Sequence, residues 1–123
     1  MEETRKRLYR SGTVRAEEQM KDGVRHGTCR YYYRSGGLKQ EATFVDGQQE
    51  GVTRDYDVDG QLAAETTFVN GTRNGPVRLL RADGSLRASY TFRDDVVEGE
   101  YCEYGPDGQL TRSVTYVNGV ARD

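Results

Sequence analysis

The sequence predicts an all-β protein in which five copies of a 24-residue β-hairpin unit form one elongated, twisted antiparallel meander sheet of about ten strands. Three observations predict it: two ladders of glycines with a period of 24, an alternation of apolar and polar side chains, and two turn dipeptides per unit. We therefore expect a single repeat domain over residues 1–123.

The glycines set the period of the repeat. One ladder consists of Gly27, Gly51, Gly75 and Gly99, and the other of Gly12, Gly36, Gly60, Gly84 and Gly108. Because two independent ladders share one spacing, the units are predicted at 4–27, 28–51, 52–75, 76–99 and 100–123. The first unit departs most from the common pattern and is predicted to be a cap.

Large side chains recur at even spacings within each unit. The fifth place holds an aromatic residue or Leu, the eleventh an aliphatic residue, and the seventeenth Met, Phe or Tyr; in the second unit these are Tyr32, Leu38 and Phe44. In an extended chain this spacing puts all three on one face, with Glu41 and Thr43 on the other. One aromatic face is therefore expected along the whole sheet.

Each unit also carries two turn signals. The first is marked by Asp59-Gly60, Asp83-Gly84 and Asp107-Gly108, and the second by Asp22-Gly23, Asp46-Gly47, Asn70-Gly71 and Asn118-Gly119. These residues tolerate the positive φ that tight hairpins need. Asp95 stands where a turn glycine belongs, so the fourth hairpin is expected to be less regular.

The glycine that ends each unit is predicted to interrupt the strand. A two-residue turn alone would place the Tyr of one unit on the opposite face from the Phe before it. A bulge or bend at Gly27, Gly51, Gly75 and Gly99 would shift the count by one and restore the aromatic face. Pro76 agrees, because it lacks an amide hydrogen. With this offset Lys39 would lie opposite Asp55, and Arg87 opposite Glu103.

Composition and charge limit the classes of protein to which the chain can belong. Only 34% of the residues are hydrophobic, which argues against a thick two-layer core. Residues 1–40 carry ten Lys or Arg against five acids, and the remainder carry eight against fifteen. Such a polarity can orient a partner or favour head-to-tail association, or it can be an ordinary solvated surface. The pI of about 5.5 argues against nucleic acid as the main partner.

The N-terminal residues and the cysteines bear on the compartment. The first twenty residues contain no apolar core of a signal peptide, so a cytoplasmic location is expected. Cys29 and Cys102 fall about six strands apart, or ~29 Å at ~4.8 Å per strand, too far for a disulfide.

No catalytic, cofactor or metal site is predicted. The single histidine, His26, lies in a turn segment without a nucleophile beside it, so the chain is not expected to be an enzyme. An acidic cluster could bind Ca²⁺, but its spacing matches no calcium loop. It consists of Asp94, Asp95, Glu98, Glu100 and Glu103.

A ladder of cations occupies the third place of the units: Lys6, Arg30, Arg54 and Arg78, ending at Cys102. By parity it lies on the expected aromatic face. Either its stems pack over aromatic rings, or it forms an anion-binding stripe, and the run from Arg30 to Arg34 would suit lipid or nucleic-acid phosphates. The candidate partner-binding residues are Arg30, Tyr31, Tyr33, Arg34, Arg54, Tyr56, Arg78 and Tyr104.

The predicted last strand, Leu110 to Val117, has an open edge. Such an edge could pair with a second copy or with a partner strand, unless the residues from Val120 to Asp123 protect it. Arg5, Lys6 and Arg7 guard the opposite edge.

The unit resembles the MORN repeat and its bacterial variant. The pattern is Gly, five residues on Tyr, then an acidic-Gly turn, Leu, three residues later Glu, and Thr-Phe-Val-Asn-Gly. It is sharpest in TRDYDVDGQLAAETTFVNGTRNG, from Thr53 to Gly75, and in YYYRSGGLKQEATFVDGQQEG, from Tyr31 to Gly51. The chain departs from it at Leu80, Ser89, Asp95 and Ser113.

The resemblance implies a function. Similar bacterial proteins are often classed as antitoxin components of toxin-antitoxin systems, and the wider MORN (membrane occupation and recognition nexus) family includes scaffolds, dimerisation elements and lipid-associated modules. It therefore implies a non-enzymatic module that binds another protein, such as a toxin or effector. The alternatives are peripheral association with anionic phospholipid, or a self-assembling scaffold.

Overall fold

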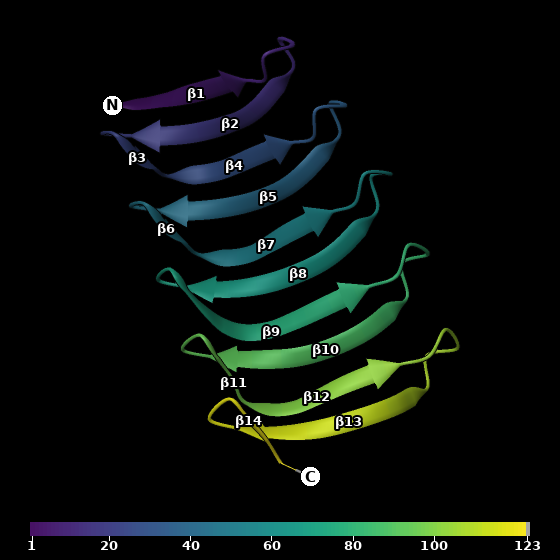
Figure 1. Cartoon of the computed structure of the whole chain (residues 1–123). Coiled ribbons are helices and arrows are strands. Elements are labelled where there is room, and N and C mark those ends of the chain that lie inside the picture. The colour runs from purple at the N-terminus through teal and green to yellow at the C-terminus, as the bar shows by residue number, and fades with distance from the viewer. Residues whose placement is uncertain (123) are drawn as a thin grey trace.

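A computed structural model describes residues 1–122, which form one open antiparallel sheet of 14 strands (Figure 1). The predicted all-β meander is confirmed. The ten long strands are β1 (Glu2–Leu8), β2 (Val14–Lys21), β4 (Gly27–Tyr32), β5 (Leu38–Val45), β7 (Gly51–Tyr56), β8 (Leu62–Val69), β9 (Thr72–Leu80), β10 (Leu86–Arg93), β12 (Gly99–Tyr104) and β13 (Leu110–Val117). The short strands are β3 (Val24–Arg25), β6 (Gln48–Gln49), β11 (Val96–Val97) and β14 (Val120–Arg122).

The strands follow one another across the sheet in chain order, and the two ends of the chain lie at its opposite ends (Figure 1). Every described element is a strand, so this part of the chain offers no helix that could cross a membrane.

The second turn of each unit is a two-residue hairpin turn with positive φ at both residues. Asp46 and Gly47 have φ of 50° and 86°, which matches a type I′ turn. Asp94 and Asp95 adopt the same conformation, at 50° and 68°, without a glycine. The fourth hairpin is therefore as regular as the others. Arg73 holds this turn, since its amide and its Nε donate to the Asp95 carboxylate at 2.7 and 3.1 Å.

The glycine that ends each unit interrupts the ladder, as predicted. Gly27, Gly51, Gly75 and Gly99 have φ between 88° and 130°. The register moves by two residues there, however, and not by one. Phe44 pairs with Gln49, and Glu41, three residues earlier, pairs with Arg54, five residues later. An even shift preserves the alternation of faces, so the predicted offset is wrong.

A different bulge changes the face, and it lies inside each long hairpin. Tyr31 pairs with Gln40 and Tyr32 with Leu38, which leaves Lys39 without an opposite residue. The same register shift recurs in every unit. The bulged residues, which have no opposite residue in their hairpins, are Arg15, Lys39, Ala63, Arg87 and Thr111.

This bulge overturns two expectations. Tyr32 and Leu38 lie on the face opposite Phe44, because the extra residue reverses the alternation between them. The predicted pair of Lys39 with Asp55 is also wrong: Asp55 lies opposite Gln40 and accepts a hydrogen bond from its Nε2 at 2.9 Å.

The predicted pair of Arg87 with Glu103 fails for the same reason. Arg87 is the bulged residue of its hairpin, so Glu103 lies opposite Ala88. The Glu103 carboxylate instead approaches Arg112, at 3.7 Å.

The sheet therefore has two unlike faces. The inner face carries the fully or nearly buried side chains, and the outer face carries the Arg ladder. The buried set is Ala16, Glu18, Met20, Cys29, Ala42, Phe44, Thr53, Val77, Ala88 and Phe92. Cys29 is buried on the inner face, Cys102 is partly exposed on the outer face, and both are free thiols.

Neighbouring units are tied together by their second turns. The amide of Gly47 donates to the carbonyl of Arg25 at 2.8 Å, and equivalent bonds link the later turns. The residue before each terminal glycine adds a side-chain contact to the next turn. The contacts are Asp46 N to His26 Nδ1 at 3.2 Å, Asn70 N to Glu50 Oε2 at 2.8 Å, Asn74 Nδ2 to Asp94 Oδ1 at 3.3 Å, and Asn118 N to Glu98 Oε2 at 2.6 Å.

Candidate interaction surface

The structure separates the residues predicted to bind a partner. Arg30, Arg54, Arg78, Tyr56 and Tyr104 lie on the outer face, where the bulge places both the third and the fifth residue of each unit. Three others lie elsewhere. Tyr31 is on the inner face opposite Gln40, and Tyr33 and Arg34 are in the first turn of the second unit.

The outer arginines pair with glutamates. Arg30 lies 2.9 Å from Glu41, and Arg54 and Arg78 lie 3.2 and 2.5 Å from Glu65. These cations therefore neither form an uncompensated anion-binding stripe nor stack on the expected rings. Exposed pairs of this kind contribute about 0.2–1 kcal/mol each.

Tyr33 and Arg34 hold the first turns together. The Tyr33 hydroxyl donates to the carbonyl of Tyr56 at 2.6 Å, as Tyr9 does to Tyr32 at 2.5 Å. The Arg34 guanidinium lies 5.2 Å from the centre of the Tyr9 ring. Both residues thus have a structural role between units.

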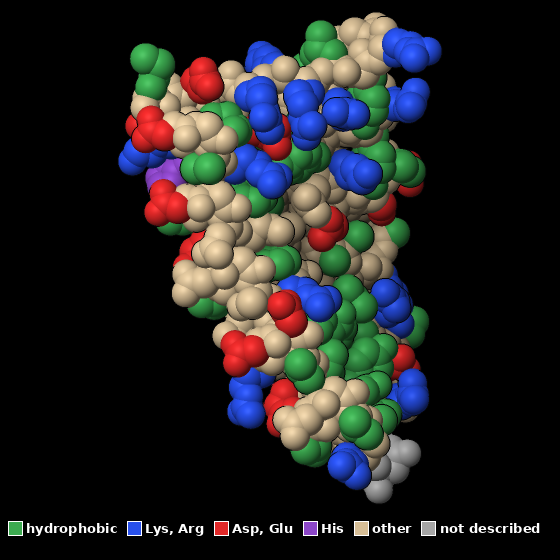
Figure 2. Space-filling view, turned by 60° about the vertical axis from the view of Figure 1, so that its left-hand side comes forward, with side chains coloured by type: hydrophobic (Ala, Val, Ile, Leu, Met, Phe, Trp, Pro, Cys, Tyr) green, Lys and Arg blue, Asp and Glu red, His purple; other side chains and the backbone are tan. Residues whose placement is uncertain are grey.

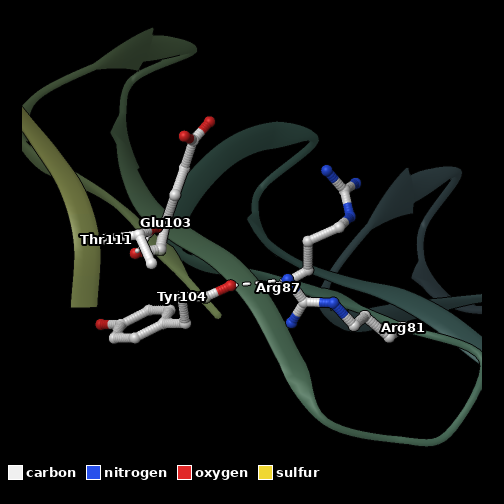
Figure 3. Close-up of a pocket in the computed structure, with 5 residues that line it drawn as sticks. All are labelled: Arg81, Arg87, Glu103, Tyr104 and Thr111. Carbon is white, nitrogen blue, oxygen red and sulfur yellow. Dashed lines mark hydrogen bonds between the residues drawn. The ribbon is translucent and has the colours of Figure 1, made fainter. Parts of the chain in front are cut away.

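Arg81 makes the corresponding link between the fourth and fifth units. Its Nη2 donates to the carbonyl of Tyr104 at 2.6 Å, across a shallow depression of about 250 Å³ (Figure 3). Arg87, Glu103 and Thr111 complete the lining. The Thr111 hydroxyl donates to the carbonyl of Glu103 at 3.2 Å, and the Glu103 carboxylate accepts from the Tyr101 hydroxyl at 2.8 Å, so these groups are engaged in structural contacts.

Three members of the acidic cluster, and His26, make contacts at the second turns. Asp94, Asp95 and Glu98 receive hydrogen bonds within and between the turns, and the Nδ1 of His26 accepts the amide of Asp46. Within residues 1–122, acidic, His and Cys side chains do not gather in a group of three that could hold a metal ion.

The N-terminal part of the inner face carries an arginine cluster that the sequence analysis missed. Arg5, Arg7 and Arg25 converge on the buried carboxylate of Glu18. Arg5 donates to Oε1 from Nε and Nη2 at 3.1 and 2.8 Å, and the Nε of Arg7 lies 3.3 Å from the same oxygen. Tyr31 donates to Oε2 at 2.9 Å, and Arg25 lies 3.8 Å from it.

Two opposing effects set the charge of Glu18. Its burial raises the pKa, but hydrogen bonds from Arg5 and Tyr31 and the charges of Arg7 and Arg5 lower it, and the net result is a pKa below the ordinary value. The carboxylate is therefore ionised at neutral pH. Burial also raises the pKa of the Tyr31 hydroxyl, so that group stays a donor.

The C-terminal part of the inner face carries an aromatic row. We use this name for Tyr90, Phe92, Tyr101 and Tyr116. Neighbouring ring centres are 5.5, 5.7 and 6.5 Å apart, spacings at which aromatic rings attract one another. The row crosses three strands, β10, β12 and β13.

The row borders an apolar depression of about 340 Å³, to which Leu79 and Val97 also contribute. Most of its side chains are only partly buried. Figure 2 shows hydrophobic side chains gathered over the C-terminal strands and Lys and Arg side chains over the N-terminal strands. One face of the sheet therefore presents a basic area and an aromatic area.

The edge of the last strand is partly covered. β14 pairs with β13 over Thr115–Val117, so the predicted protection begins with Val120–Arg122, while Asp123 lies outside the described residues. The described chain contributes no further strand beside Leu110–Val114.

Comparison with protein-family models shows which known repeat these hairpins match. The model of the MORN repeat variant matches residues 25–46, 49–70 and 97–118, which together cover more than half of the chain. The chain belongs to the MORN repeat variant family. The three matches start and end at equivalent places of the unit, from the short strand to the next second turn. No curated protein matches the chain.

The MORN match leaves out residues 73–94, which include Leu80 and Ser89, two of the noted departures. The structure nevertheless forms the same hairpin there, from β9 and β10. MORN repeats are non-catalytic repeat modules, and membership of the family favours a binding role for the chain.

Proposed function

We propose that this MORN repeat protein binds another protein through the inner face of its sheet, and that it neutralises a toxin or effector-like partner in the manner of an antitoxin or immunity protein. The observation that supports the binding surface is the aromatic row beside its apolar depression. The antitoxin role follows from the resemblance of the units to bacterial antitoxin-like repeats.

The chemistry of the row suits protein recognition. Tyr and Phe bury a large area with few rotatable bonds, and Tyr and Arg supply much of the energy of protein interfaces. The outer face has fewer free groups, because its arginines are paired with Glu41 and Glu65.

The backbone beneath the row is held in place. Successive turns are joined by hydrogen bonds such as that from Gly119 to Val97 at 3.0 Å and that from Asn118 to Glu98 at 2.6 Å. A surface built on such linked units loses little conformational freedom when it binds, which favours affinity.

Matched pairs of substitutions test the surface. Tagged wild-type protein should isolate a stoichiometric protein partner from its native host. Tyr90→Ser with Tyr101→Ser on the inner face should lose that partner, whereas Tyr56→Ser with Tyr104→Ser on the outer face should keep it. Loss only with the outer pair would contradict the proposal.

Coexpression tests the antitoxin role. The isolated partner, expressed alone, should arrest growth, and coexpression of the wild-type chain should restore growth while the inner-face pair does not. A partner that is harmless alone would refute neutralisation but leave the binding surface standing.

The arginine cluster favours a second candidate, peripheral association with anionic phospholipid. Arg5, Arg7 and Arg25 expose between 41% and 49% of their side chains. In liposome flotation, vesicles containing phosphatidylserine should then retain the protein at low salt. Retention should fall with Arg7→Gln and Arg25→Gln, which belong to the cluster, and failure to float would exclude this function.

Self-association through Leu110–Val114 remains a further proposal, since an open strand edge can pair with a second copy. Analytical ultracentrifugation over a concentration series should show a dimer. A monomer at all concentrations would rule it out.

A further inference from the structure

We propose that the arginine cluster receives carboxylates of the partner protein, so that the inner face recognises a segment that is acidic at one end and apolar at the other. This rests on the proposed protein-binding function and specifies the chemistry of the partner. The proposed occupant of the face is a segment of a partner protein. The experiment below distinguishes it from a membrane surface and from a second copy of this chain.

Donors remain free in the cluster. Each guanidinium has five N–H groups in a fixed plane. Glu18 accepts two hydrogen bonds from Arg5 and forms an ion pair with Arg7 at 3.3 Å, and Arg25 donates one hydrogen bond to the hydroxyl of Tyr31 at 3.2 Å. The other donors belong to side chains that are roughly half exposed. Three cations surround one anion, so an anionic group can enter.

Glu18 acts here as a positioning residue. Its side chain is fully buried and is held by Arg5 and Tyr31, so it draws the guanidiniums together at a defined place. Without it, three like charges would repel one another. Arg25 is fixed further by its guanidinium, which lies 4.5 Å from the centre of the Phe44 ring.

There is space for the incoming group. A depression of about 270 Å³ lies beside the cluster, lined by Arg5, Met20, Gly23, Val24, Arg25 and Gly47. Arginine binds carboxylates through two parallel N–H bonds, which also fixes their orientation.

The two areas lie on one face at a distance that a short segment spans. Six strand steps separate β2 from β10, or about 29 Å at ~4.8 Å per step. An extended chain covers this with about nine residues at ~3.3 Å each. A single segment can therefore reach both the arginine cluster and the aromatic row.

Charge favours a protein segment over a membrane. Residues 41–123 carry fifteen acids against eight bases, and Glu103 lies on the inner face close to the aromatic row. A flat anionic bilayer would meet this acidic part as well as the basic part, and repulsion would offset the attraction. A narrow segment with its acids at one end meets each area separately.

The experiment selects peptides from a random display library on the wild-type protein. Synthetic forms of the enriched peptides are then titrated by fluorescence anisotropy. The cluster variant is Arg7→Gln with Arg25→Gln, which keeps Arg5 and Tyr31 on Glu18. Its matched control is Arg30→Gln with Arg54→Gln, which removes the same charge from the outer face. Circular dichroism checks that both variants fold.

The expected peptides carry Asp or Glu at one end and apolar residues at the other. Their affinity should fall at least about tenfold with the cluster variant, and less than about twofold with the control, because only the former loses charge-assisted bonds. Enriched peptides without acids, or an equal loss in both variants, would overturn the inference.

The remaining outcomes separate this inference from the proposed function. Acid-free peptides that are lost with Tyr90→Ser and Tyr101→Ser would leave the aromatic surface standing and refute the acidic end. Acidic peptides that ignore those substitutions would support the cluster and count against the aromatic surface. No enrichment, with retention on phosphatidylserine vesicles that the cluster variant abolishes, would refute both in favour of a membrane. Enrichment only of segments from this chain's own sequence would identify a second copy as the occupant.

Discussion

Arg5 and Glu18 lie directly opposite each other in the first hairpin, and the guanidinium donates two hydrogen bonds, at 3.1 and 2.8 Å, to one oxygen of the fully buried carboxylate. Because Arg7, Arg25 and Tyr31 approach the same carboxylate, the group that holds the first two units together also organises the basic area of the inner face.

The substitution Glu18→Gln should destabilise the protein by about 1–3 kcal/mol, because it removes charge-assisted hydrogen bonds and leaves the arginines uncompensated. Glu41→Gln, which breaks one exposed pair with Arg30, should have an effect of at most about 1 kcal/mol. Urea unfolding followed by circular dichroism measures both. Equal effects would contradict the special position of Glu18.

Glu18 should also make stability depend on pH. Its folded pKa is lowered from an ordinary value of 4.5, so it stabilises the protein above that pH, and this contribution disappears as the pH falls through the folded pKa. Unfolding free energies measured from neutral pH downward should therefore fall more steeply below about pH 4.5 in the wild type than in Glu18→Gln. Parallel curves would show that the carboxylate is not held by its partners.

Gly75 should tolerate substitution less well than Gly51. Both have positive φ, at 130° and 92°, so Ala strains the backbone at either position by about 1–2 kcal/mol. At Gly75 the new Cβ would also lie 2.9 Å from Cγ2 of Thr67, whereas nothing lies within 4 Å at Gly51.

Gly75→Ala should therefore lower the unfolding free energy by at least about 1 kcal/mol more than Gly51→Ala. Adding Thr67→Ser, which removes Cγ2 and keeps the hydroxyl, should restore part of the difference. Chemical denaturation measures it, and no gain from Thr67→Ser would show that the approach to Cγ2 is not what matters.

The contacts between turns should be visible in amide exchange. Glu50 accepts the Asn70 amide at 2.8 Å, so Glu50→Ala should speed hydrogen exchange at Asn70 and cost about 0.5–1.5 kcal/mol. The amide of Asn118, which pairs with Glu98, serves as the internal control. A change at both amides would indicate a global effect instead of a local contact.

The two thiols should differ in reactivity. Cys29 has no exposed surface, and burial raises its pKa, whereas Cys102 is partly exposed. In the folded protein an aromatic disulfide reagent should modify one thiol quickly, and mass mapping should place it at Cys102. Cys29 should react only on unfolding, and early labelling of Cys29 would contradict its burial.

Much of the fold could be predicted from the sequence because turns and periodicity are local. The pairs Asp46-Gly47 and Asn70-Gly71 tolerate the positive φ of a tight hairpin turn, and the structure has it at each. The glycine interruptions at Gly27 and Gly75 were likewise predictable, although their size was not, since a shift of one or two residues leaves the same mark in the sequence.

The surface could not be predicted because it depends on the bulge. The bulged residues include Arg15, Ala63 and Thr111, which share no property that would mark the place. A count that ignores the bulged residue assigns the side chains on one side of the bulge to the wrong face of the sheet. Glu18 then looks like any polar residue of a strand, and only its opposition to Arg5 reveals the arginine cluster.

The central claim is that the bulge at Lys39 and its equivalents divides the side chains into an inner binding face and an outer face of ion pairs. Its most direct test is nuclear magnetic resonance of the protein in solution, through cross-strand backbone Overhauser contacts of Asp55. The register predicts contacts from Asp55 to Gln40 on one side and to Ala64 on the other. Contacts to Lys39 and Ala63 instead would reverse the faces and contradict the account.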